Sequence, residues 1–182
     1  LMGCSTLNAS PEFAWPDLEE LKPIDDIRPV PADIWQRRAI SYSGYREGQS
    51  PRLEIYPSDE EVLEDLRILI KAGFGLIRVY NSVGHGEQVI RIINDNKLDL
   101  KVQAGAYISG SFEKNGEFNT REITRVVELA NQYPEIVMGV SIGNEILVSW
   151  SFVAVPPQEA IGYIRWVRER IRQPVTVNDN WE

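Results

Sequence analysis

The sequence predicts an α/β fold in which parallel strands alternate with helices, and three observations lead to that prediction. Short apolar runs rich in β-branched residues alternate four times with amphipathic stretches of helical periodicity, and a fifth apolar run follows. No turn signal typical of an antiparallel hairpin stands between these segments. The loop after the first run, SGYREGQSP, is not the glycine-rich phosphate turn that a doubly wound sheet would carry. A (β/α)8 barrel with right-handed crossovers is therefore favoured over an open doubly wound sheet.

The expected barrel is partial. A complete (β/α)8, or TIM, barrel needs roughly 250 residues, whereas the chain has 182 and its alternation begins near Trp35. Residues 35–182 therefore supply about the first five strands and four helices. Five parallel strands leave two open sheet edges, so we expect either a longer natural sequence or a partner segment that completes the barrel.

The expected elements can be placed in order along the chain. Strands are predicted at residues 39–43, 76–80, 100–107, 137–147 and 174–177. The first helix follows Ser58, which forms a capping box with Glu61, and it ends at Gly73. The second helix spans residues 87–96. Apolar residues share one face of each helix: Val62, Leu66, Leu69 and Ile70 in the first, and Val89, Ile90, Ile92 and Ile93 in the second.

Two further helices follow the third and fourth strands. Asn119 and Glu122 form a second candidate capping box, which predicts a helix over residues 121–132. Pro157 suits the first turn of the fourth helix, because its missing N–H is not needed there. The inward residues of that helix are expected to be Ile161, Ile164, Val167 and Ile171.

Composition narrows the classes of ligand. A hydrophobic content of 43% with 25% charged residues is normal for a soluble globular protein. The net charge of -8 argues against nucleic acid as a partner. One cysteine and one histidine exclude an internal disulfide and a His-rich zinc site, and no carboxylate spacing suggests a metal or cofactor. Five Trp and seven Tyr favour a neutral, sugar-like ligand, although many of these rings will be core.

The first residues, LMGC, resemble the end of a bacterial lipoprotein signal, in which Cys4 receives the lipid. Membrane contact would then occur only through this anchor, which holds a protein at a membrane surface without spanning it. No window has the length of a membrane-spanning helix. Residues 1–34, rich in Pro, Asp and Glu, are predicted to be a lipobox remnant and flexible tether. The expected location is the bacterial cell envelope, outside the cytoplasm.

The stretch VMGVSIGNEIL, residues 137–147, is the most informative one. It is an apolar run typical of a strand buried on both faces, and it ends at Gly143, Asn144 and Glu145. Substrates bind at the carboxyl ends of parallel strands, so an amide and an acid at this point indicate chemistry. On the dipeptide alone, the start of a polar loop would be the simpler interpretation. The remainder of the chain favours the functional one.

Five segments in order, AISYSGYREGQSP, LIRVYN, KVQAGAYI, GVSIGNEI and PVTVNDNWE, resemble the first five strands of the bacterial β-1,3-glucanases of glycoside hydrolase family 17. The resemblance runs from about Trp35 to the last residue. It implies a (β/α)8 barrel with Glu145 as general acid/base and Asn144 bound to the sugar 2-hydroxyl. The family's nucleophile is a second glutamate after the seventh strand. No residue here corresponds to it, and Glu182, just beyond strand five, is not assigned that role.

Further binding residues are predicted at the strand ends. Tyr80 matches a family position whose hydroxyl lies close to the nucleophile. Arg78 lies two residues before Tyr80, so both face one side of their strand. Arg78 either pairs with a carboxylate cluster or belongs to a structural network, and for Gln103 a structural role is favoured. Other candidates for contact with sugar rings or hydroxyls are Tyr45, Trp181 and Asp179, followed by Tyr42, Trp150 and Asn180.

The leading functional hypothesis is a lipid-anchored retaining glycoside hydrolase that cleaves β-1,3-glucan, with no cofactor. A retaining mechanism needs two carboxyl groups about 5 Å apart, so the 182-residue chain by itself is expected to be inactive. One alternative is a transglycosylase of the same family, which uses the same residues but transfers the glycosyl group to a sugar. Another is a glycan-binding lipoprotein or half-barrel without catalysis, which would bind saccharide and leave it intact.

Overall fold

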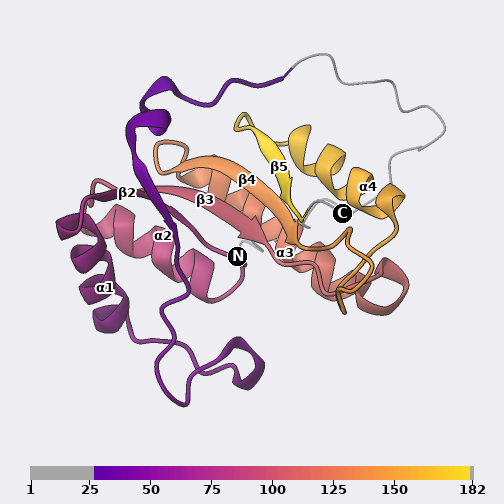
Figure 1. The fold of residues 1–182 in the computed structure, drawn as a ribbon, viewed down its shortest axis with the longest axis horizontal. Helices are drawn as coiled ribbons and strands as arrows, with labels where there is room; N and C mark the ends of the chain where they lie inside the picture. Colours follow the sequence, from indigo (N-terminus) through magenta and orange to yellow (C-terminus); the bar gives the residue numbers. More distant parts are fainter. Residues whose placement is uncertain (1–26, 181–182) are drawn as a thin grey trace, which may run out of the picture.

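The computed structural model describes residues 27–180, which form a single sheet covered by helices (Figure 1). Residues 1–26, with Cys4 and most of the predicted tether, and residues 181–182, with Trp181, lie outside the described residues. The strands are β1 (Arg38–Ser41), β2 (Phe74–Arg78), β3 (Lys101–Ala106), β4 (Val137–Asn144) and β5 (Val175–Asn178). The helices are α1 (Asp59–Lys71), α2 (His85–Asp95), α3 (Phe112–Gln132) and α4 (Pro157–Arg168), with short 3-10 turns η1 (Ala32–Gln36) and η2 (Pro51–Leu53).

The order of the strands confirms the predicted fold class. All neighbouring strands are parallel, and the sheet order β1-β2-β3-β4-β5 follows the sequence. A doubly wound sheet would reverse its strand order at a switch point. Sequential order with a helix between successive strands is the winding of a (β/α)8 barrel. The five strands therefore form a curled half-barrel, which is part of a TIM barrel (Figure 1).

The two faces of the sheet differ in chemistry. On the helix-covered face lie fully buried apolar residues, among them Ile77, Val102, Ala104, Val140 and Ile142. Because side chains alternate along a strand, the intervening positions of β2, β3 and β4 point to the opposite face. Apart from Phe74 and Leu76 of β2, those positions mostly carry polar or small residues, among them Arg78, Gln103, Gly105 and Ser141. The apolar pattern therefore aims a row of polar side chains at the interior of the half-barrel.

The predicted ends of the first helix are confirmed. Glu61 N donates to Ser58 Oγ at 3.2 Å and Ser58 N donates to Glu61 Oε2 at 2.8 Å, so both bonds of the capping box are present. Gly73 follows the helix with a φ of +85°, the left-handed conformation that glycine adopts without strain. In α2 the predicted inward residues are all buried, and Val62 and Leu66 are fully buried in α1.

Two details of the later helices were predicted wrongly. Helix α3 begins at Phe112, and Asn119 and Glu122 lie inside it with exposed fractions of 0% and 2%, so they are not a capping box. A break at Asn115, whose φ is -129°, interrupts the periodicity in front of the predicted start. In α4, Ile161 is 40% exposed, because Tyr163, Trp166 and Val167 form the inner face.

A contact near the amino end joins distant parts of the chain. The Arg28 guanidinium donates to the carbonyl oxygens of Arg168 at 2.7 Å, Ile171 at 2.6 Å and Gln173 at 3.2 Å. These carbonyls end α4 and lead into β5, where backbone acceptors lack helical partners. Within residues 27–180, no helix is long and apolar enough to cross a membrane.

Candidate active site at the end of β4

A tight turn at the end of β4 presents Glu145. Gly143 and Glu145 have φ values of +73° and +55°, so the chain takes two left-handed residues within three positions. A Cβ on Gly143 would lie 2.6 Å from Ile146 Cγ2, and Ile146 is fully buried. A left-handed glutamate is strained by roughly 1–2 kcal/mol, and such strain concentrates at functional sites. The buried Ile146 and a hydrogen bond from Glu145 N to Asn178 O at 2.8 Å hold the turn.

The Glu145 carboxylate is free to meet a ligand. Its side chain is half-buried, and it makes no hydrogen bond or ion pair with any residue in the described part of the chain. It lines an open pocket of about 430 Å³ between the ends of β4 and β5. The other lining residues are Arg78, Asn144, Val177, Asn178, Asp179 and Asn180. Four predicted site residues therefore accompany Glu145 in this pocket: Arg78, Asn144, Asp179 and Asn180.

Arg78 organises the floor of the pocket. Its Nη2 donates to Asn144 Oδ1 at 2.7 Å, and its guanidinium lies 4.7 Å from the centre of the Tyr80 ring. Burial lowers the pKa of Arg78, while Tyr80 and Glu145 act in the opposite direction, and an arginine stays charged throughout. Because Arg78 occupies the amide oxygen of Asn144, the amide nitrogen of Asn144 remains available to donate to a ligand.

Asn178 completes this network and was missed in the sequence. With its amide oxygen toward the guanidinium, it accepts from Arg78 Nε at 2.9 Å and its amide nitrogen donates to Ser141 Oγ at 2.7 Å. This orientation places an acceptor against a group that has only donors. The Gln103 amide lies 3.2 Å from that of Asn178. The signal for Asn178 was its place directly after the predicted fifth strand. Its register with Asn144 is visible only in the structure.

Asp179 supports the loop after β4. Its Oδ2 accepts from Leu147 N at 2.7 Å and its Oδ1 accepts from Asn180 N at 2.9 Å. The carboxylate therefore joins the chain that follows β5 to the loop that carries Glu145. In this arrangement Asp179 fixes the wall of the pocket that it lines.

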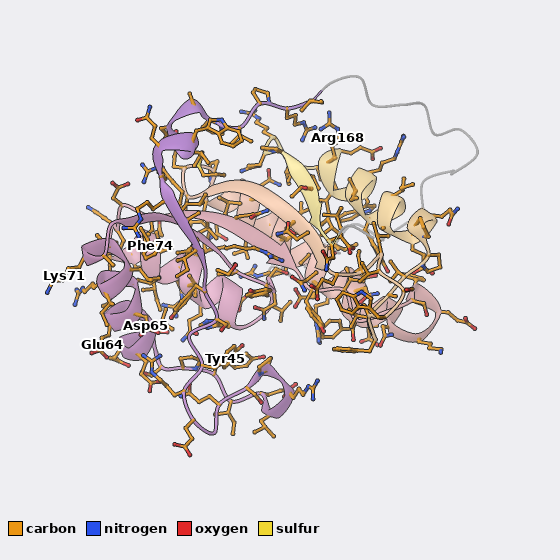
Figure 2. The ribbon with its side chains drawn as sticks, viewed as in Figure 1. Tyr45, Glu64, Asp65, Lys71, Phe74 and Arg168 are labelled. Carbon is orange, nitrogen blue, oxygen red and sulfur yellow. The ribbon has the colours of Figure 1, made fainter. Side chains whose placement is uncertain are left out.

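Tyrosines predicted to contact sugar occupy different places. Tyr80 stands beside Arg78 and is 38% exposed. Tyr45 lies in the β1–α1 loop, apart from β5 (Figure 2), where its ring is 5.0 Å from that of His85, and burial raises its pKa to about 12. Tyr42 is buried, and its hydroxyl donates to Asp65 Oδ2 at 3.0 Å, so it is a core residue. Neither Tyr45 nor Tyr42 lines the Glu145 pocket.

Two other observations bear on where the site lies. A larger depression, of about 870 Å³, runs between α2 and α3 and contains none of the predicted site residues. We place the site at the strand ends because ligands of barrel folds bind there. Among residues 27–180, no group of three His, Cys, Asp or Glu side chains is arranged to hold a metal ion.

Comparison with known proteins relates the chain to a solved glycoside hydrolase structure. No family model and no curated protein matches the chain. The crystal structure of an endo-laminarinase from Formosa Hel1_33_131 is 27% identical with a TM-score of 0.70, and the match covers 80% of this chain and 42% of that one. The chain thus spans less than half of that protein. The match relates the chain to a glycoside hydrolase of the β-1,3-glucanase type.

Two weaker matches carry no argument because their TM-scores are 0.47. One is the carboxyl transferase domain of Rhizobium etli pyruvate carboxylase, at 16% identity, covering 69% of this chain and 20% of that one. The other is a β-glucuronidase from Parabacteroides merdae, at 12% identity, covering 66% and 16%.

Proposed function

We propose that this chain is part of a retaining β-1,3-glucan hydrolase of glycoside hydrolase family 17, and that this part carries the general acid/base, Glu145. The observation that carries the proposal is a free carboxylate on a strained turn at the carboxyl end of the fourth strand. The likeness to an endo-laminarinase supports the substrate class. The nucleophile lies outside the 182 residues in this proposal.

The chemistry assigns Glu145 two steps. In the first, the protonated carboxyl gives its proton to the glycosidic oxygen while the nucleophile attacks the anomeric carbon and the C–O bond breaks. In the second, the Glu145 carboxylate takes a proton from water, whose oxygen attacks the anomeric carbon and releases the nucleophile. Asn144, held by Arg78 through its oxygen, donates from its nitrogen to the sugar 2-hydroxyl. Tyr80 and Asp179 contact sugar hydroxyls, while Tyr45 and Trp181 bind sugar units further from the cleaved bond.

The decisive experiment measures reducing-sugar release from laminarin by the natural gene product and by its Glu145→Gln variant. Removal of a general acid/base lowers rates by roughly 10²–10⁴-fold, so we expect a loss in that range with the melting temperature unchanged. Glu64→Gln is the matched control, because Glu64 is an exposed residue of α1 (Figure 2) and the change removes the same charge. Turnover by Glu145→Gln equal to that of Glu64→Gln would refute the proposal.

The product pattern separates the alternatives. Elongated oligosaccharides would identify a transglycosylase, in which a sugar hydroxyl replaces water in the second step. Binding of laminari-oligosaccharides without cleavage by the natural gene product would identify a glycan-binding protein.

We also propose that the protein is held in the bacterial cell envelope by a lipid on Cys4, with residues 1–34 as lipobox remnant and tether. The support is the LMGC pattern together with a composition rich in Pro, Asp and Glu. Incorporation of labelled fatty acid should be lost in the Cys4→Ala variant, and labelling that persists in this variant would contradict the anchor.

A further inference from the structure

A second glutamate, Glu122, lies at the same end of the sheet and is completely enclosed. Its exposed fraction is 2%. Its carboxylate accepts hydrogen bonds from residues that follow two different strands. Oε2 accepts from Ser82 N at 2.8 Å, Ser82 Oγ at 2.9 Å and Tyr107 N at 3.1 Å, and Oε1 accepts from Val83 N at 3.3 Å. Ser82 and Val83 follow β2, and Tyr107 follows β3.

The backbone that Glu122 holds has little room to move. A Cβ on Gly105 of β3 would lie 2.4 Å from Val79 O and 2.7 Å from Tyr80 O. A Cβ on Gly86 of α2 would lie 1.8 Å from Asn81 O. The segment from Tyr80 to Ser82 is therefore packed between β3 and α2 and fastened by a carboxylate from α3. In a close-packed interior, a shift at one of these contacts displaces the others.

This segment connects Glu122 to the candidate active site. Tyr80 packs against the Arg78 guanidinium, which donates to Asn144 at 2.7 Å, next to Glu145. The connection is a run of direct contacts: Glu122 to Ser82, the backbone from Ser82 to Tyr80, Tyr80 to Arg78, and Arg78 to Asn144. Glu122 itself does not line the pocket.

We infer that Glu122 is a positioning residue, which sets the place of Tyr80 and, through Arg78, of the Asn144 amide that meets the ligand. The inference rests on the proposed function for the ligand, a β-1,3-linked glucose oligosaccharide. Asn119 provides a contrast on the same helix: it is equally buried and bonds to Ser109, Gly110 and Tyr163, none of which contacts Tyr80 or Arg78 in the interactions described above.

The test compares Glu122→Gln with Asn119→Ala in the natural gene product. Glutamine keeps the size of the side chain but puts an NH2 group among the backbone N–H donors of Ser82, Val83 and Tyr107. We expect the Tyr80 ring and Arg78 Nε–H resonances to shift in Glu122→Gln and to match the wild type in Asn119→Ala, even when Asn119→Ala lowers the melting temperature more. Titration with laminaripentaose should give a Kd about tenfold weaker for Glu122→Gln and within twofold of wild type for Asn119→Ala.

The outcomes distinguish the two proposals. If wild-type chain does not bind laminaripentaose, the proposed function loses its support, and the resonances of Tyr80 and Arg78 still decide the role of Glu122. Wild-type resonances in Glu122→Gln, or a Kd within twofold of wild type, would overturn the inference. Should Glu122→Gln not fold, Ser82→Ala removes only the hydroxyl contact, and smaller shifts in the same direction are expected; their absence would overturn the inference equally.

Discussion

Glu145 and Glu122 both lie near the carboxyl ends of the strands, but their surroundings are opposite. Glu145 stands on a left-handed turn, half-buried, and has no hydrogen-bond partner within the described part of the chain. Glu122 stands inside a helix, fully buried, and accepts from three backbone N–H groups and a hydroxyl. A buried carboxylate is tolerated when donors surround it, whereas a carboxylate left free at a strained position contributes little to stability. Glu122 therefore supports the fold, and Glu145 is available for chemistry.

The largest difference in stability should appear when each of the two acids is replaced in a separate variant. Glu122→Ala leaves the N–H groups of Ser82, Val83 and Tyr107 unpaired in a buried place, at a cost of about 3 kcal/mol in the free energy of unfolding. Glu145→Gly should instead raise that free energy by about 0.5–1 kcal/mol, because glycine relieves the left-handed strain. Urea denaturation of both variants measures the difference. Equal losses of unfolding free energy in the two variants would contradict the different roles of Glu122 and Glu145.

A second prediction concerns the turn that presents Glu145. Gly143→Ala adds a Cβ 2.6 Å from Ile146 at a φ of +73°, and we expect a loss of about 2 kcal/mol together with reduced saccharide cleavage. Gly48→Ala is the control, because Gly48 has a φ of +77° and nothing within 4 Å of the added Cβ, so only about 1 kcal/mol of strain applies. Denaturation curves that coincide for the two variants would show that crowding at Ile146 does not fix the turn.

The smallest expected effect is a pH dependence that belongs to Glu122. Burial raises the pKa of Glu122 above its ordinary value, and the hydrogen bonds from Ser82, Tyr107 and Val83 oppose that rise. A raised carboxyl pKa means that its contribution to stability is complete below the ordinary value of about 4.3 and is lost as pH rises through the raised value. The stability of wild type relative to Glu122→Gln should therefore fall as pH rises from about 4.3 towards neutral pH. A difference that is constant over this range, or that grows, would contradict the assignment.

Glu122 also shows where sequence reasoning failed. Asn119 and Glu122 have the spacing of a capping box. Before them, the break at Asn115 and the following Gly116 interrupt the helical pattern. A local motif cannot reveal that both side chains point inward, because their partners, Ser82 and Tyr163, lie 40 and 44 residues away along the chain. The sequence did not indicate that the β1–α1 loop places the Tyr45 ring 5.0 Å from that of His85, and the contact of Tyr45 with sugar stays a prediction.

The sequence by itself determined the alternation of strands and helices, the parallel sheet, and the position of Glu145 at a strand end. These features follow from the period of the apolar residues and from local signals such as Ser58 and Gly73, each of which acts within a few residues. Only the tertiary structure decided that Arg78 joins Asn144 and Asn178, and that Glu122 fastens two strand ends. Those contacts depend on the register between strands and on the angle of a helix against the sheet, which no short stretch of sequence contains.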